Sequence, residues 1–371
     1  MKGVVLIGAT GSIGWNTLEV VRQHAGKLRL VGVAAAQNRE RLDAIAREFA
    51  VPHASLFADE GVEGLLRLAT LEEADTVLLA ATGTVGLRPA LAALEAGKTL
   101  ALASKEVLVV AGGLVMETAR RHGARILPVD SEHNAIFQCL HGRPADASVR
   151  RLILTASGGA FRNLPSEALD RVTPEDATQH PNWDMGPKIT VDSATMANKG
   201  LELIEAHWLF GLPPDQLDVV LHTQSLVHSM VEFIDGSVLA QLSPPSMTFA
   251  IQYALLYPER ADSTAERLDF SRALQLDFAP VDMKRYACLR LAREAMEAGG
   301  GAPAVFNAAN EVAVNRFLEK RLPFVAIPDV IAHCLESLSP PAHDGTVEEL
   351  LATEESARTV ASRFADTRMR A

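Results

Sequence analysis

The feature that most constrains the fold is a short apolar run followed by three evenly spaced glycines. Residues 4–7, Val-Val-Leu-Ile, are typical of a buried strand, and a helical pattern runs through Leu18 and Val21. Between them lies a glycine turn, residues 8–14, with the pattern G-x-x-G-x-x-G. Glycines let the backbone approach a pyrophosphate, and the next helix offers free N–H groups and a positive dipole end. The segment therefore predicts a nucleotide-binding strand, turn and helix, with a purely structural turn as the alternative.

Further apolar runs continue an alternation of strands and helices. Residues 28–36 predict a second strand, and residues 76–80 and 99–103 predict two more. Strands that alternate with helices form a doubly wound parallel sheet, whose ligands lie outside the carboxyl ends of the strands. Lys105 and Glu106 follow such an end, so we expect them where a cofactor meets a substrate. An exposed ion pair is the alternative.

The residues after the second strand favour NADPH over NADH. An NAD enzyme usually has an acidic residue there, which binds the ribose hydroxyls. This chain has Ala36, Gln37 and Asn38 instead, so no acid repels a ribose phosphate. Arg39 and Arg41 can pair with a 2′-phosphate, although both can equally be surface charges on the next helix.

Two carboxylates, Asp130 and Glu132, follow an apolar run at residues 126–129 that predicts a strand. Alternate strand residues point the same way, so both carboxylates project to one side if strand geometry persists. Two ionised carboxylates in a small space repel unless a proton or a cation lies between them. A hard metal site and a solvated acidic turn are the two interpretations.

Two polar segments follow a strand predicted at residues 151–155. The first, Ser157-Gly158-Gly159, can bind an oxyanion through its hydroxyl and backbone N–H groups, or can be a turn alone. The second, residues 180–186, is a loop between prolines that contains Trp183. A large apolar side chain in a loop either anchors the core or closes over a ligand as a lid.

Residues 192–202 lead into a predicted helix that continues to residue 209. Three of its polar residues, Asn198, Lys199 and Glu202, share one face because positions three and four apart are neighbours. Ser193 can join them. A hydroxyl, an amide and an ammonium suit a phosphate. The carboxylate of Glu202 can add a third ligand to a metal held by Asp130 and Glu132. An ordinary helix face with a Lys–Glu pair is the alternative.

The remaining chain predicts structural elements more than chemistry. Strands are expected at residues 218–221 and 238–242, the latter in an antiparallel hairpin, and the histidines between them favour structural roles. Residues 262–282 are irregular and predict a linker. From residue 283 the pattern is helical, and three polar residues there are expected to make hydrogen bonds between helices: Asn307, Asn310 and Glu311.

Composition excludes several classes of protein. A net charge of -11 and a pI near 5.5 argue against a dedicated nucleic-acid binder. Cys139, Cys288 and Cys334 have no metal or redox spacing, which favours reduced thiols in a cytoplasmic protein. The apolar segment at the N-terminus is too short for a signal peptide, and no uncharged apolar run is long enough to cross a bilayer.

Taken together, the motifs closely resemble those of the 1-deoxy-D-xylulose 5-phosphate reductoisomerase family, in the same order. The segments that carry the resemblance are residues 8–14, 104–106, 129–135, 157–159, 180–183, 192–196, 198–202 and 307–311. The resemblance implies a cytoplasmic homodimer that uses NADPH and Mg²⁺ or Mn²⁺. The implied reaction converts 1-deoxy-D-xylulose 5-phosphate to 2-C-methyl-D-erythritol 4-phosphate in non-mevalonate isoprenoid precursor biosynthesis.

The fold that we expect is α/β with four parts. They are an N-terminal doubly wound, Rossmann-like NADPH-binding domain (1–128), a central α+β catalytic domain for metal and substrate (129–261), a linker (262–282) and a C-terminal helical domain (283–371).

The resemblance also implies roles for individual residues. The metal ligands are Asp130, Glu132 and Glu202, which with Lys105 form the catalytic set. The residues implied to bind the substrate are Lys105, Ser131, Glu132, Ser157, His180, Trp183, Ser193, Asn198, Lys199 and Glu202. Those implied to bind NADPH are Gly8, Thr10, Gly11, Ser12, Ile13, Ala36, Gln37, Asn38, Ser104, Glu106 and Gly186.

Three positions depart from the family pattern, and two other classes of function compete. Ser104 replaces a common Asn, Gln37 a frequent basic residue and Pro187 a common Arg, and all three bear on cofactor binding. A semialdehyde dehydrogenase has a similar glycine turn but needs a cysteine nucleophile, for which Cys139 is the candidate. A nucleotide-sensing regulator without catalysis would leave the acidic residues and the phosphate pocket unexplained.

Overall fold

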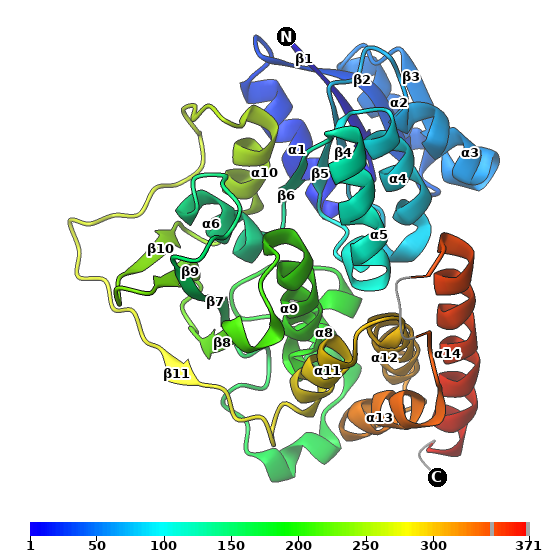
Figure 1. The fold of residues 1–371 in the computed structure, drawn as a ribbon, viewed down its shortest axis with the longest axis vertical. Helices are drawn as coiled ribbons and strands as arrows, with labels where there is room; N and C mark the ends of the chain where they lie inside the picture. Colours follow the sequence, from blue (N-terminus) through cyan, green and yellow to red (C-terminus); the bar gives the residue numbers. More distant parts are fainter. Residues whose placement is uncertain (342–344, 369–371) are drawn as a thin grey trace. The chain divides into compact units, whose positions relative to one another are not determined.

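The computed structural model describes residues 1–341 and 345–368, which form two compact units (Figure 1). Unit 1 comprises residues 1–107, 112–143 and 246–268, and unit 2 comprises the other described residues. Positions 342–344 and 369–371 of the predicted helical domain lie outside the described residues. The predicted division into four parts follows function rather than compactness, and it stays a prediction.

Unit 1 is built on a parallel sheet with the strand order β3-β2-β1-β4-β5-β6. This is the doubly wound order, in which the strand sequence reverses between β1 and β4 and leaves a crevice for a ligand at their carboxyl ends. The predicted α/β fold is thus confirmed. The strands are β1 (Lys2–Ile7), β2 (Leu28–Ala35), β3 (His53–Leu56), β4 (Thr76–Leu79), β5 (Thr99–Leu102) and β6 (Ile126–Pro128).

The helices of unit 1 cover both faces of this sheet, because right-handed crossovers change face where the strand order reverses. In agreement, α1 packs against α10, whereas α3 packs against α4. The helices are α1 (Ser12–Gln23), α2 (Arg39–Glu48), α3 (Phe57–Ala69), η1 (Gly83–Gly86), α4 (Leu87–Glu95), α5 (Glu106–His122), α6 (Ser131–Cys139) and α10 (Met247–Leu256).

Unit 2 contains a mixed sheet with the order β10-β9-β7-β8-β11. β7 and β8 are parallel, and β9 and β10 form the predicted antiparallel hairpin, which confirms that expectation. The strands are β7 (Val149–Ala156), β8 (Leu217–Leu221), β9 (Val227–Phe233), β10 (Val238–Leu242) and β11 (Ala279–Pro280).

Two groups of helices complete unit 2: those between β7 and β8, and a C-terminal group. α9 packs on β7 and β8 and also against α11, while α12 packs against α8, α13 and α14. They are η2 (Ser166–Arg171), α7 (Pro174–Ala177), α8 (Pro187–Thr195), α9 (Ala197–Phe210), η3 (Pro214–Gln216), α11 (Ala287–Ala298), α12 (Ala302–Leu318), η4 (Phe324–Ala326), α13 (Ile327–Ser337) and α14 (Val347–Thr367).

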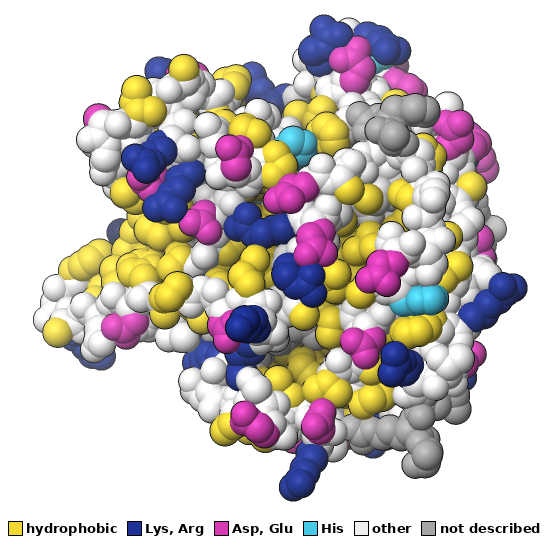
Figure 2. Space-filling model, turned by 60° about the horizontal axis from the view of Figure 1, so that its bottom comes forward, with side chains coloured by type: hydrophobic (Ala, Val, Ile, Leu, Met, Phe, Trp, Pro, Cys, Tyr) yellow, Lys and Arg dark blue, Asp and Glu magenta, His cyan; other side chains and the backbone are white. Residues whose placement is uncertain are grey.

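The surface carries charges of both signs. On the face drawn in Figure 2, Lys and Arg side chains are interspersed with Asp and Glu side chains. Within residues 1–341 and 345–368, every helix is too short or too polar to span a lipid bilayer.

Candidate functional site

The glycine turn of unit 1 forms a backbone cradle between β1 and α1. Gly8 has a φ of +98°, and a Cβ there would lie 2.4 Å from the carbonyl oxygen of Ala80. A Cβ on Gly14 would lie 2.4 Å from the oxygen of Gly8. Gly11 precedes α1 without a side-chain cap, so the N–H groups of the first turn remain available to an anion. The predicted strand, turn and helix are confirmed, and the cradle fits the pyrophosphate of a dinucleotide.

The segment after β2 lies beside this cradle. The N–H groups of Gly8 and Ala9 both donate to the oxygen of Ala34, at distances of 3.0 and 2.8 Å. Asn38 begins α2 as its N-cap, because its Oδ1 accepts from the N–H of Arg41 at 3.0 Å. Residues 36–38 are thus placed at the carboxyl edge of the sheet, where the ribose of a dinucleotide binds.

Two further residues predicted to contact the cofactor, Ser104 and Glu106, follow the carboxyl end of β5 in unit 1. Ser104 is buried, and its hydroxyl donates to the oxygens of Ala81 and Leu79 at 2.5 and 3.3 Å. Glu106 is the first residue of α5. The Ser104 hydroxyl therefore holds the end of β4 beside β5, which explains how a Ser is accommodated at this position.

Asp130 and Glu132 lie at the start of a helix, so the condition under which strand geometry would project both carboxylates to one side is not met. β6 ends at Pro128, and Asp130 is the N-cap of α6, accepting from the N–H of Glu132 at 3.3 Å. Ser131 donates from Oγ to Oε2 of Glu132 at 2.5 Å. The physical reason is local. As the N-cap, Asp130 accepts a hydrogen bond from a free N–H group of the first helical turn, and this favours a helix over a continued strand.

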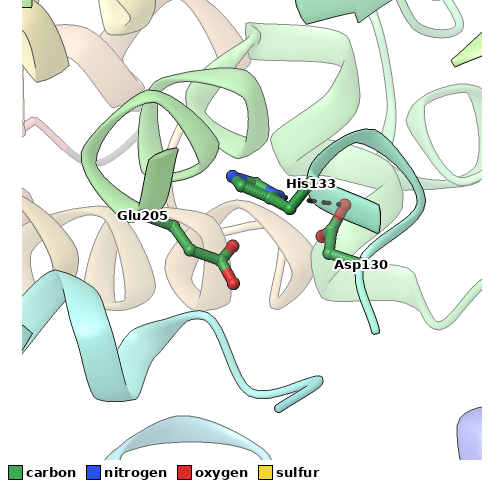
Figure 3. A group of neighbouring side chains, drawn as sticks. All are labelled: Asp130, His133 and Glu205. Carbon is green, nitrogen blue, oxygen red and sulfur yellow. Dashed lines mark ion pairs between the residues drawn. The ribbon is translucent and has the colours of Figure 1, made fainter. Parts of the chain in front are cut away.

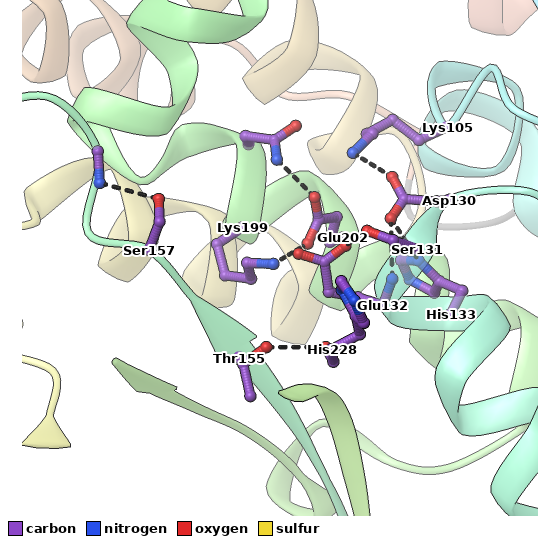
Figure 4. Close-up of polar contacts among 12 residues, drawn as sticks. Lys105, Asp130, Ser131, Glu132, His133, Thr155, Ser157, Lys199, Glu202 and His228 are labelled. Atoms are coloured by element: carbon purple, nitrogen blue, oxygen red, sulfur yellow. Dashed lines mark hydrogen bonds and ion pairs between the residues drawn. The ribbon is translucent and has the colours of Figure 1, made fainter. Parts of the chain in front are cut away.

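Asp130 is the centre of a charged cluster within unit 1 (Figures 3 and 4). Its Oδ2 lies 2.6 Å from the Nζ of Lys105, and its Oδ1 lies 3.6 Å from the Nδ1 of His133. Burial acts to raise the pKa of Asp130, but Lys105 and His133 outweigh burial and hold this pKa well below its usual value. Asp130 is therefore ionised at neutral pH, as a metal ligand must be.

In unit 2, the Ser157 turn is joined to the loop of residues 180–186. The Nδ1 of His180 accepts from the N–H groups of Asn182 and Trp183 at 3.1 and 3.0 Å. Its other nitrogen, Nε2, therefore carries the proton and donates to the Ser157 hydroxyl at 2.8 Å. Burial, followed by the charge of Arg162, lowers the pKa of His180 to about 4, so the ring is neutral at pH 7.

The polar face of α9 is confirmed as a set of neighbours (Figure 4). Asn198 donates to Oε1 of Glu202 at 2.5 Å, and Lys199 forms an ion pair with the other carboxylate oxygen. Ser193 lies on the preceding helix, α8, because Met196 adopts the left-handed conformation and separates the two helices.

The Ser157 turn packs directly on α8. A Cβ at Gly159, whose φ is +71°, would lie 2.6 Å from the oxygen of Ser193. Gly159 also donates from its N–H to Ser157 Oγ at 3.2 Å. The two hydroxyl-bearing segments of the predicted phosphate pocket are therefore held together through backbone contacts.

Trp183 contacts a histidine that sequence spacing did not connect to it. The rings of Trp183 and His228 meet edge to face, with centroids 6.2 Å apart. His228 is buried on β9, and its Nε2 lies 2.9 Å from the hydroxyl of Ser243. Burial lowers its pKa to about 4. His228 is thus a neutral group beside the loop, and only pairing of the strands brings it there.

The three cysteines lack the properties of a nucleophile. All are free and buried. Burial raises the pKa of the thiol to about 11 in Cys139 and Cys334, and to about 12 in Cys288. A semialdehyde dehydrogenase needs a thiolate, so this alternative finds no candidate residue.

Fold and donor groups together define a class of protein: an α/β oxidoreductase with a dinucleotide cradle in unit 1 and hydrogen-bonded polar side chains on the Ser157 turn and on α9 in unit 2. Three family models match the chain. The model of 1-deoxy-D-xylulose 5-phosphate reductoisomerase matches residues 4–61 and 55–112, and models described as C-terminal domains of the same enzyme match residues 126–210 and 242–360.

Curated relatives agree with this match. A 1-deoxy-D-xylulose 5-phosphate reductoisomerase of Halalkalibacterium halodurans is 50% identical over 354 residues, which cover 91% of this chain and 92% of the relative. One from Nitrosomonas europaea is 49% identical and covers 91% of this chain and 87% of the relative. The chain therefore belongs to the 1-deoxy-D-xylulose 5-phosphate reductoisomerase family. The predicted family and the prediction of an enzyme are confirmed.

Solved structures show the same fold. A crystal structure of DOX-P reductoisomerase in complex with NADPH, fosmidomycin and magnesium has a TM-score of 0.92 and 39% identity, covering 98% of both chains. The 1-deoxy-D-xylulose 5-phosphate reductoisomerase from Zymomonas mobilis in complex with NADPH has a TM-score of 0.91 and 40% identity, covering 99% of both chains.

Proposed function

We propose that this protein uses NADPH and Mg²⁺ or Mn²⁺ to rearrange and reduce 1-deoxy-D-xylulose 5-phosphate to 2-C-methyl-D-erythritol 4-phosphate, a step of non-mevalonate isoprenoid precursor biosynthesis. The observation that carries the proposal is the 50% identity to a reductoisomerase over 91% of this chain. The backbone cradle at Gly8 and Gly14 supports the cofactor, because a dinucleotide pyrophosphate needs such a close approach.

The proposed metal ligands are Asp130, Glu132 and Glu202. Carboxylate oxygens suit a hard cation, and the low pKa of Asp130 keeps this ligand ionised. When bound, the metal would act as a Lewis acid toward oxygens of the substrate. Lys105 would move from its pair with Asp130 toward the reacting end of the substrate, where Ser131 and His180 also bind.

The phosphate of the substrate would bind to Ser157, Ser193, Asn198 and Lys199. Each of these groups, two hydroxyls, an amide and an ammonium, can donate a hydrogen bond to a phosphate oxygen, which only accepts. Binding the remote phosphate orients the reacting end, and closure of the loop with Trp183 would exclude water from the intermediate. NADPH would contact residues 10–13, 36–38, 104, 106 and 186.

The test is NADPH consumption with deoxyxylulose phosphate, with and without divalent metal, together with identification of the product. We expect turnover that stops after chelation and returns when Mg²⁺ or Mn²⁺ is added back. A mock-chelated sample to which buffer alone is added controls for loss of protein. Turnover that survives exhaustive chelation would contradict the metal assignment, and absence of methylerythritol phosphate would contradict the reaction.

We also propose that the protein is a cytoplasmic homodimer. Large apolar side chains lie exposed on the hairpin of unit 2, including Ile234 at 68% and Leu239 at 45% exposure. Phe270, in the predicted linker, is 76% exposed. Such side chains support an interface with a second copy. Sedimentation should give twice the monomer mass, and Leu239→Glu should shift the protein toward monomer; a monomeric wild type would disprove the dimer.

A further inference from the structure

The loop after β2 is where a dinucleotide enzyme distinguishes NADPH from NADH. Parallel pairing sets the ends of β1 and β2 side by side, with Ile7 opposite Ala34. The first turns of α1 and α2 therefore both border the position of the adenosine ribose. A 2′-phosphate at this edge needs a cation within reach.

Three side chains near the start of α2 could contact the 2′-phosphate, and their charges and environments differ. Gln37 is neutral. Arg39 forms an ion pair with Asp59 of α3, so its charge is already paired within the protein. Arg41 is exposed, and among residues 1–341 and 345–368 no carboxylate lies within ion-pair distance of it.

Arg41 is oriented by an aromatic ring instead. Its Cζ lies over the ring of Trp15 in α1, 5.5 Å from the centroid. Arg22 lies 5.7 Å from the same ring, but it also pairs with Glu19 and Glu48 at 2.5 Å each. Stacking on a ring holds a guanidinium by its face and leaves its N–H edge free to donate.

We propose that Arg41, held against Trp15, binds the 2′-phosphate of NADPH and sets the preference of this enzyme for NADPH over NADH. This inference rests on the proposed function, because it assumes that NADPH is the cofactor. The exposed Trp15 also acquires a role: with 48% of its surface exposed, it is otherwise an unexplained apolar side chain beside the cradle. Gln37 needs no charge if Arg41 supplies it.

The test is equilibrium binding without substrate or turnover. Calorimetry would compare adenosine 2′,5′-bisphosphate with 5′-AMP, and NADPH with NADH, for wild type, Arg41→Gln and Arg39→Gln. Loss of one guanidinium–phosphate contact should weaken the two 2′-phosphorylated ligands about 10- to 100-fold in Arg41→Gln and leave 5′-AMP and NADH nearly unchanged. Arg39→Gln, which removes a neighbouring exposed Arg, should change all four affinities less than about threefold.

A second variant tests the aromatic contact. Trp15→Leu should weaken NADPH binding about 3- to 10-fold, less than Arg41→Gln, because the guanidinium remains but loses its orientation. Melting temperatures of all variants control for folding. The proposal is wrong if Arg39→Gln has the larger effect, if Arg41→Gln weakens NADH equally, or if it changes nothing. If the wild type binds neither dinucleotide, the proposed function itself fails, which is a different outcome.

Discussion

The glycine cradle of unit 1 and the predicted phosphate pocket of unit 2 (Ser157, Ser193, Asn198 and Lys199), both proposed to bind phosphate groups, are built in opposite ways. The cradle uses backbone N–H groups, and its shape depends on the absence of Cβ atoms at Gly8 and Gly14. The pocket uses side chains whose charges are already paired, such as Lys199 with Glu202. We expect the cradle to be sensitive to added volume and the pocket to be sensitive to lost charge at constant volume.

The largest effect is expected for Glu202→Gln, which removes one charge with almost no change in volume. If Glu202 is a metal ligand, turnover should fall about 1000-fold, because the electrostatic stabilisation of the reaction is lost. Glu294→Gln, at an exposed pair with Arg290, is the control and should retain activity. Steady-state kinetics over a Mg²⁺ titration measures this. Near-normal turnover in Glu202→Gln would show that the pocket tolerates lost charge.

The second-largest effect is expected in the cradle for Gly14→Ala, which adds volume without charge. The new Cβ would collide with the backbone at Gly8, so we expect a loss of about 2–3 kcal/mol in the free energy of unfolding and weaker NADPH binding. Gly26→Ala is the matched control, because a Cβ there meets nothing within 4 Å. Denaturant unfolding and NADPH titration of both variants measure the effects. Equal stability of the two variants would refute the volume argument.

A third prediction compares two buried asparagines of α12 that differ in what they reach. Asn310 donates to Asp192, which precedes Ser193, at 2.9 Å, whereas Asn307 donates to Glu354 at 3.0 Å. Each Asn→Ala variant should lose about 1–3 kcal/mol in the free energy of unfolding, because a buried carboxylate loses a donor.

Only Asn310→Ala should also raise the KM for the substrate, since Asp192 fixes the helix that carries Ser193. We expect a rise of about 3- to 10-fold, equivalent to about 1 kcal/mol, with kcat less affected. An equal rise in both variants would mean that general destabilisation, and not the position of α8, controls substrate binding.

The last prediction concerns the pH dependence of stability, where the change within one pH unit is small. Burial lowers the pKa of His228 to about 4, so the unfolded chain binds more protons than the folded chain between about pH 6.5 and 4. The free energy of unfolding has its full value above the pKa that His228 has in the unfolded chain. It falls as the pH decreases toward 4, by up to about 1.4 kcal/mol per pH unit for one group. His228→Asn should reduce this slope by one proton, measured by urea unfolding from pH 4.5 to 7.5. Wild type unfolded in parallel at each pH is the reference, and an unchanged slope in His228→Asn would contradict the prediction.

The comparison also explains which predictions succeeded. The cradle is a contiguous strand, turn and helix, so its glycine spacing determines the structure locally. The face formed by Asn198, Lys199 and Glu202 was predictable for the same reason, because it depends on helical spacing. The hydrogen bonds from Asn307 and Asn310 to other helices were also expected and are confirmed.

Other features depended on contacts between distant segments. Sequence left Arg39 and Arg41 equivalent, and the tertiary structure separates them: Arg39 pairs with Asp59, 20 residues away, whereas Arg41 lies over the ring of Trp15. Similarly, the contact between Trp183 and His228 exists because β9 pairs with β7. The backbone conformation at Asp130 and Glu132 was not predictable for a different reason. A helix N-cap and a continued strand are both compatible with this sequence, and the structure has the N-cap.

The sequence by itself thus determined the α/β class, the cradle and the family, because these depend on short-range spacing and on motifs in order. The tertiary structure alone decided which Arg is available to a phosphate, which histidine contacts Trp183 and that a buried Asp192 links α8 to α12. The physical reason is that backbone conformation is set within a few residues. The charge, burial and partner of a side chain are instead set by chain segments that folding brings together.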